Sequence, residues 1–113
     1  MDYEAYLNRQ LPRIFPDPSM QARVRQELAR YGTESYEREV PRVHLCILKL
    51  CSGNAGKVRE LVEMAKQDYR DVIAWAQYPA QMQSDPSITD PDAKRRILDK
   101  DMQQFVQWLE EDV

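Results

Sequence analysis

Apolar residues between Asn54 and Tyr78 recur with the spacing of one face of an α-helix. They fall at i, i+3, i+4 and i+7, and the pattern occurs twice. The apolar members of this stripe are Val58, Leu61, Val62, Ala65, Tyr69, Val72, Ile73 and Ala76. A single helix cannot bury such a stripe by itself, so the pattern predicts a long helix that packs against other helices.

A nearly continuous apolar run precedes this helix, between Pro41 and Gly53. Periodicity leaves both a buried helix and a buried strand open for it. We favour a central, buried helix over residues 41–51, because the chain has no second strand-like run for pairing. The short turn that follows, with Asn54 as N-cap, predicts an antiparallel hairpin of two helices.

Two further helices are predicted before the apolar run. The first covers residues 3–10, and Pro12 closes it. The second begins at Asp17-Pro18, where an N-cap residue is followed by proline at the first helical position. Gly32 is expected to stop this helix, because glycine readily adopts the left-handed conformation that ends many helices.

The last helix is predicted to begin at Asp90-Pro91, after a loop over residues 79–90. Its apolar stripe consists of Ile97, Leu98, Met102, Phe105, Val106 and Leu109. Taken together, the elements predict an all-α protein. We expect a single domain over residues 1–113, a bundle-like array of about five helices with a long helix at about 54–78.

Composition and charge narrow the class of protein. The chain has 113 residues, 42% of them hydrophobic and 31% charged, which is typical of a soluble globular domain with one core. Its net charge of −3 argues against general nucleic-acid binding, which needs an excess of Lys and Arg. No apolar stretch approaches the ~20 residues of a membrane span. The first ten residues lack a signal-peptide pattern, so we expect a cytoplasmic protein without membrane contact.

The residues His44, Cys46 and Cys51 form an H-x-C-x4-C pattern that invites a metal-site interpretation. On a helix, however, His44 and Cys51 are ~10.5 Å apart along the axis, too far to share one ion easily. We therefore interpret both cysteines as buried structural residues and expect no metal and no cofactor. No nucleophile motif or glycine-rich phosphate loop is present either, so no catalytic residue is assigned.

A second line of side chains runs beside the apolar stripe of the long helix. Its members are Met64, Asp68, Asp71, Trp75 and Tyr78. On a continuous helix Asp68 and Asp71 would be near neighbours, able to act as acid and base or to hold a cation. The structural alternative is that basic residues such as Arg70 and Lys66 pair with the aspartates, while the aromatic rings flank the core.

The densest basic patch is Lys94-Arg95-Arg96 with Lys100, near the start of the last helix. Aspartates at positions 90, 92, 99 and 101 surround it. A solvated, salt-bridged face is therefore the simpler interpretation, and contact with nucleic acid is the weaker one.

The stretch ILKLCSGNAGKVRELVEMAKQDYRDVIAWAQYP resembles a segment found in small bacterial helical proteins of unknown function. The resemblance rests on SGN, on the KVRELVEMAKQDYRDV helix and on the closing AQYP. It implies a bacterial, cytoplasmic, helical protein. It brings no activity and no catalytic residues.

Three functions remain open. We favour a non-enzymatic interaction protein that self-associates or binds a protein partner, because catalytic motifs are absent and aromatic residues are common at interfaces. The aromatic candidates, which we expect to be exposed, are Tyr3, Tyr6, Trp75, Tyr78 and Trp108. The first alternative is a small-ligand or cation binder, enzymatic or not, that uses the acidic and aromatic line. The second is a nucleic-acid-associated protein that uses the basic patch.

Overall fold

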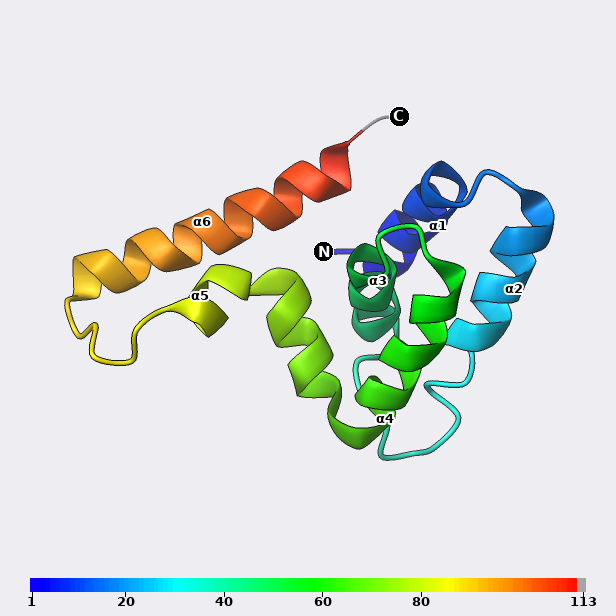
Figure 1. Ribbon diagram of the computed structural model, residues 1–113, viewed down its shortest axis with the longest axis horizontal. Coiled ribbons are helices and arrows are strands. Elements are labelled where there is room, and N and C mark those ends of the chain that lie inside the picture. The colour runs from blue at the N-terminus through cyan, green and yellow to red at the C-terminus, as the bar shows by residue number, and fades with distance from the viewer. Residues whose placement is uncertain (112–113) are drawn as a thin grey trace.

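The computed structural model describes residues 1–111, and every regular element in that range is an α-helix. The predicted all-α, bundle-like class is confirmed. The six helices, shown in Figure 1, are α1 (Tyr3–Ile14), α2 (Pro18–Leu28), α3 (Val40–Leu50), α4 (Ala55–Gln77), α5 (Pro79–Gln83) and α6 (Pro91–Glu110).

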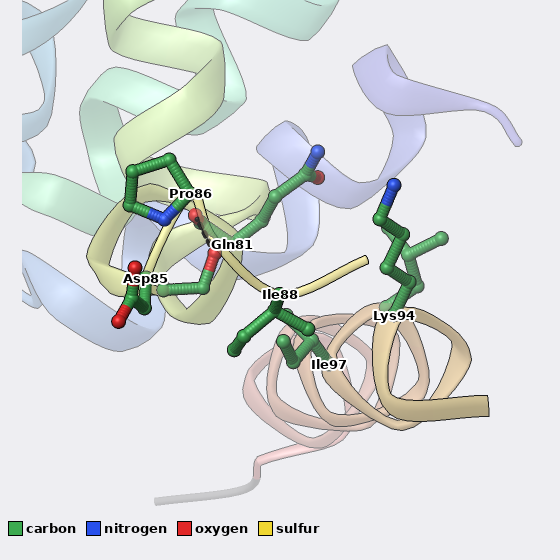
Figure 2. Close-up of a pocket in the computed structure, with 8 residues that line it drawn as sticks. Gln81, Asp85, Pro86, Ile88, Lys94 and Ile97 are labelled. Atoms are coloured by element: carbon green, nitrogen blue, oxygen red, sulfur yellow. Dashed lines mark hydrogen bonds between the residues drawn. The ribbon is translucent and has the colours of Figure 1, made fainter. Parts of the chain in front are cut away.

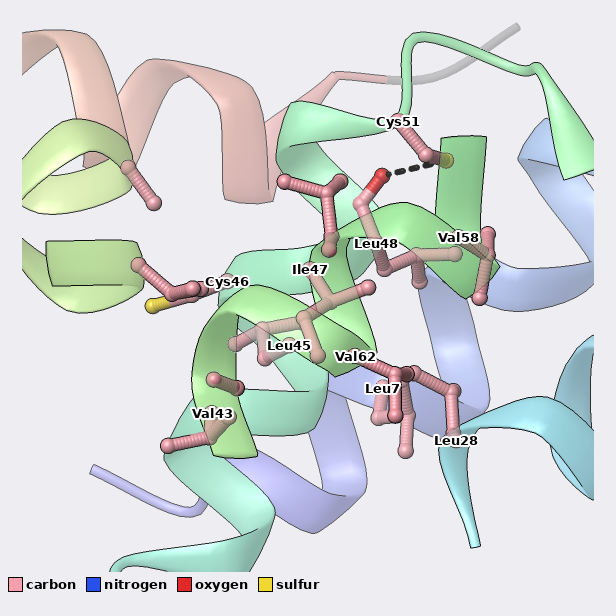
Figure 3. Close-up of a cluster of buried hydrophobic side chains, with 14 of the residues drawn as sticks. Leu7, Leu28, Val43, Leu45, Cys46, Ile47, Leu48, Cys51, Val58 and Val62 are labelled. Carbon is pink, nitrogen blue, oxygen red and sulfur yellow. Dashed lines mark hydrogen bonds between the residues drawn. The ribbon is translucent and has the colours of Figure 1, made fainter. Parts of the chain in front are cut away.

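Helix α3 is the most buried element, and its helical conformation confirms the choice made for residues 41–51. Its side chains from Leu45 to Leu48 have no exposed surface. Helices α1 and α4 pack directly against α3, and α2 covers α4. Figure 3 shows how α3 meets Val58 and Val62 of α4 in the core.

The predicted hairpin of α3 and α4 is also confirmed. Ser52 and Gly53 turn the chain with φ values of 52° and 76°, in the left-handed region that favours glycine. Asn54 then caps α4, because its side chain accepts hydrogen bonds from the N–H groups of Gly56 and Lys57.

The prediction that Pro12 closes the first helix is wrong, because α1 continues through Pro12 to Ile14. A proline inside a helix removes one backbone hydrogen bond. Burial of Leu11 and Phe15 on either side offsets that loss, and the Phe15 N–H still reaches the Leu11 carbonyl at 2.8 Å. Packing therefore outweighs the local cost of the proline.

Helix α2 ends at Leu28, four residues before the predicted stop at Gly32. The chain tightens after Leu28, since Arg30 and Tyr31 donate to carbonyls only three residues earlier. Gly32 adopts a φ of 110° at the end of this turn, where a side chain would be strained. The glycine thus reverses the chain without ending the helix itself.

The prediction of a loop over residues 79–90 is wrong for its first part, because the short helix α5 covers Pro79–Gln83. Helix α4 is also not continuous. Asp68 has φ −156° and ψ 101°, an extended conformation that breaks the helix there. In Figure 1 the first segment of α4 stays beside α2 and α3, while the second leads toward α5 and α6.

Helix α6 runs back across the molecule, so that its C-terminal end approaches α1 (Figure 1). The Gln104 side chain donates to the Ala76 carbonyl at 3.2 Å, and Gln10 of α1 donates to the carbonyls of Trp108 and Leu109. These contacts fix α6 against the ends of α4 and α1.

The predicted apolar stripe of α6 is wrong for half of its members. Phe105 and Leu109 are buried in the core. Leu98, Met102 and Val106 instead remain 47%, 68% and 37% exposed. The stripe therefore divides into an inner line that packs against the protein and an outer line that faces solvent.

Candidate functional site

Asp68 serves as the N-cap of the second segment of α4. Its Oδ1 accepts a hydrogen bond from the Arg70 backbone N–H at 3.0 Å, which satisfies a free donor of the new helical start. The Arg70 guanidinium also donates to both carboxylate oxygens, at 3.0 and 3.1 Å. Hydrogen bonds from the side chain and backbone of Arg70 lower the pKa of Asp68. This pairing matches the structural alternative for Asp68.

The four predicted site residues are not gathered into one site. Asp68 borders a hollow of about 320 Å³ between α4 and the segment before α3. Tyr78 borders a separate groove against α6. Asp71 and Trp75 are exposed on the helical surface between them and line neither cavity. The break at Asp68 separates Met64 and Asp68 from the second segment of α4, where Asp71, Trp75 and Tyr78 keep their helical spacing.

Glu37 organises the hollow beside Asp68. Its Oε1 accepts hydrogen bonds from the N–H groups of Gly32, Thr33 and Glu34, each at 3.0 Å. Its Oε2 lies 3.2 Å from the Lys66 ammonium, so Lys66 pairs with Glu37 rather than with an aspartate. Burial alone would raise the pKa of Glu37, but the backbone N–H groups and Lys66 outweigh it and lower that pKa to about 2.

This arrangement makes the hollow a structural joint. The Glu37 carboxylate is saturated with donors, and the Tyr31 hydroxyl donates to the Arg38 carbonyl at 2.7 Å. Burial raises the pKa of Tyr31 to about 12, despite the favourable bond to that carbonyl. Both groups hold the chain after α2 in place, and neither is poised to exchange protons near neutral pH.

A second hollow of about 410 Å³ lies between α5, the following loop and the start of α6 (Figure 2). Ile88 of the loop and Ile97 of α6 form its apolar side. The Asp85 carboxylate accepts a hydrogen bond from the Ser87 N–H at 2.9 Å, which lowers the pKa of Asp85. Asp85 therefore shapes the loop, and the polar groups of this hollow do not converge on one point.

The basic patch beside this hollow is solvated, as predicted, but the salt bridges expected for it are absent from the described residues. Lys94, Arg95 and Arg96 are exposed, and no ion pair within residues 1–111 engages them. Asp101, which was expected to help neutralise the patch, is fully buried. It caps α5 instead, accepting bonds from the N–H groups of residues 80 and 81.

The cysteines are buried, as predicted, and both are free thiols. Burial raises the pKa of Cys46 to about 12 and also raises the pKa of Cys51, whose thiol donates to the Leu48 carbonyl at 3.0 Å. His44 lies 3.0 Å from the Tyr31 carbonyl, and burial lowers its pKa. Across residues 1–111 no three His, Cys, Asp or Glu side chains come together to hold a metal ion.

An apolar groove lies between the N-terminus, the end of α4 and α6, and encloses about 250 Å³. It is lined by Met1, Gln77, Tyr78, Leu98, Met102, Phe105 and Val106. Arg42 of α3 holds its wall in place, donating to Gln77 Oε1 at 2.8 Å and to the Tyr78 hydroxyl at 3.4 Å. Tyr78 is therefore the only predicted site residue in this groove.

The exposure of the aromatic candidates is mixed. Trp75 and Tyr78 are exposed as expected. Tyr3, Tyr6 and Trp108 instead pack partly buried against the core, so their expected exposure is wrong.

Sequence reasoning missed the outer line of α6 because an apolar residue on a helix was assumed to face inward.

Comparison of the chain with protein-family models, with curated proteins and with solved structures found no match. The resemblance to small bacterial helical proteins stays a prediction. Within residues 1–111, no helix combines the length and the apolar character needed to cross a bilayer.

Proposed function

We propose that this protein is a non-enzymatic, cytoplasmic interaction protein that self-associates through α6 and the adjoining apolar groove. The observation that carries the proposal is the outer line of α6. Leu98, Met102 and Val106 recur every four residues on the solvent side of α6 and also border the groove beside Tyr78. Together with Tyr78 they form one apolar surface beside the groove.

Such a surface is unfavourable in water. Contiguous exposed apolar patches on soluble proteins commonly mark interaction sites, whereas single exposed residues do not. Burying a large aliphatic side chain stabilises by roughly 1.5–3 kcal/mol when the side chain starts fully exposed. The three side chains of the outer line start about half exposed, so each offers a fraction of that figure. A symmetric pair buries every contributing side chain twice.

The other surfaces give weaker support for a function. The Asp68 carboxylate is engaged by Arg70, and the break in α4 separates it from Tyr78. The basic patch spans fewer than two turns of α6. The two buried thiols are free, which agrees with a reducing cytoplasm.

Sedimentation equilibrium or light scattering on the full chain, over a range of protein concentrations, tests the proposal. We expect a concentration-dependent dimer that dissociates in the Met102→Lys variant, because a charge would be placed in the centre of the outer line. Met64→Lys is the matched control, since Met64 is also exposed but lies on α4. A wild-type chain that stays monomeric at the highest soluble concentration would overturn the proposal.

A further inference from the structure

The outer line of α6 continues in both directions to residues of opposite charge. The spacing of four residues runs through Lys94, Leu98, Met102, Val106 and Glu110, all of them exposed. The basic residue is at the N-terminal end of this ridge and the acidic residue is at the C-terminal end. Met102 is the midpoint, eight residues from each charge, or ~12 Å along the helix axis.

The charges and apolar residues of this ridge complement those of a second, antiparallel copy of the same ridge. A twofold axis through Met102 places Leu98 of one copy beside Val106 of the other and brings the two Met102 side chains together. The same axis places Lys94 beside Glu110 of the second copy, at both ends of the contact.

We propose that the occupant of the α6 surface is a second copy of this chain, docked antiparallel with Met102 on the twofold axis and with two reciprocal Lys94–Glu110 ion pairs. This inference rests on the self-association proposed above and specifies its geometry. The contact is isologous, so one patch supplies both sides of the interface.

Charge selects this arrangement over its competitors. A parallel pair would place Lys94 beside Lys94 and Glu110 beside Glu110, which is repulsive at both ends. A shift of one turn would place Lys94 beside Val106 and leave the charges unpaired. No ion pair within residues 1–111 engages Lys94 or Glu110, so both are available to a second copy.

Charge reversal on the full chain tests the register. Lys94→Glu is expected to raise the dimer dissociation constant by about tenfold at low salt, because two reciprocal attractions become repulsions. Lys100→Glu is the matched control, since it changes the net charge equally on the same helix but lies off the ridge, and it is expected to change the constant little. The difference between the two variants is expected to shrink at high salt.

Rescue provides the second measurement. Glu110→Lys alone is expected to weaken the dimer as Lys94→Glu does, and the double variant is expected to restore it. A mixture of the two single variants is expected to form heterodimers in preference to either homodimer. The mixed pair has opposite charges at both ends of the ridge, whereas each homodimer has like charges at both ends.

The outcomes separate the two proposals. A dimer that Met102→Lys disrupts, but that neither charge reversal weakens, would overturn the register and leave self-association standing. An equal effect of Lys94→Glu and Lys100→Glu would show that net charge is responsible, which also overturns the register. A wild-type chain that is monomeric throughout would overturn both proposals.

Discussion

The carboxylate of Asp101 accepts a hydrogen bond from the backbone N–H of Ala80 at 2.7 Å. A second bond, from the Gln81 N–H, is 3.0 Å long. Because α5 begins at Pro79, these are the first N–H groups that α5 presents, and a residue of another helix caps them. Asp101 is fully buried on the otherwise apolar inner line of α6. The contact between α5 and α6 therefore depends on a buried carboxylate.

Removal of this carboxylate should destabilise the fold. We expect Asp101→Ala to lower the free energy of unfolding by about 2–4 kcal/mol, because two part-buried hydrogen bonds to a fully buried carboxylate are lost. Urea unfolding followed by circular dichroism measures the difference. Asp99→Ala is the control, since Asp99 is exposed on the same helix and should change stability by no more than about 0.5 kcal/mol. Equal effects of the two variants would contradict the capping role.

Acid should weaken the joint at Glu37. Its pKa in the folded protein is about 2, below the ordinary value of 4.5, so its ionised form is favoured by folding. The stability it contributes is therefore fully present above pH 4.5 and is lost as the pH falls toward 2. We expect Glu37→Gln to reduce stability at pH 7 and to flatten the loss of stability over this acidic range.

Thermal unfolding of wild type and variant between pH 7 and pH 2.5 provides the measurement. Glu34→Gln is a suitable control, because Glu34 is an exposed neighbour that contributes its backbone N–H rather than its carboxylate to the joint. If Glu37→Gln retained the same pH profile as wild type, the carboxylate would not be the group responsible.

The break in α4 gives a prediction about Asp68. Asp68→Ala should lower the melting temperature by a few degrees, because the segment from residue 69 loses its N-cap. Asp68→Asn should change it little, since asparagine caps equally well. A cation site at Asp68 and Asp71 would instead give a calcium-dependent rise in melting temperature that both Asp68→Asn and Asp71→Asn abolish.

The buried thiols should be inert in the folded protein. Burial raises the pKa of Cys46 to about 12, so almost none of it is thiolate at pH 8. We expect neither cysteine to react with an aromatic disulfide reagent under native conditions, and both to react at once in guanidinium. Rapid labelling of one thiol in the native state would show that α3 opens locally.

Helix starts were predictable from sequence because capping is a local interaction. Asp17-Pro18 and Asp90-Pro91 both begin helices in the structure, and each aspartate accepts the backbone N–H two residues ahead. The end predicted at Pro12 was wrong because it too relied on a local preference. Packing of the neighbouring residues outweighs the tendency of proline to end a helix. The break at Asp68 had a signal too, because Asp68 and Asp71 are spaced as an N-cap and an acidic N3 residue.

The buried polar residues could not be assigned from sequence. Asp101 lies four residues from Ile97 and from Phe105, on the inner line of α6, yet only the position of α5 explains it. Glu37 occurs in a segment without periodicity, and its partners depend on the turn after α2. The groove was missed because the inner and outer lines of α6 are both apolar in sequence. Only the fold shows that the inner line packs against the core while the outer line faces solvent.

Gln10 connects the first helix to the last, through bonds of 2.9 and 2.8 Å to the carbonyls of Trp108 and Leu109. These residues are separated by 98 and 99 positions, so the bonds close nearly the whole chain into one loop. Contacts of such separation form late in folding, whereas the α3–α4 hairpin closes across a short turn. We therefore expect α6 to dock last, so that newly made chains expose the inner line of α6, with Phe105 and Leu109, until the rest of the molecule has folded.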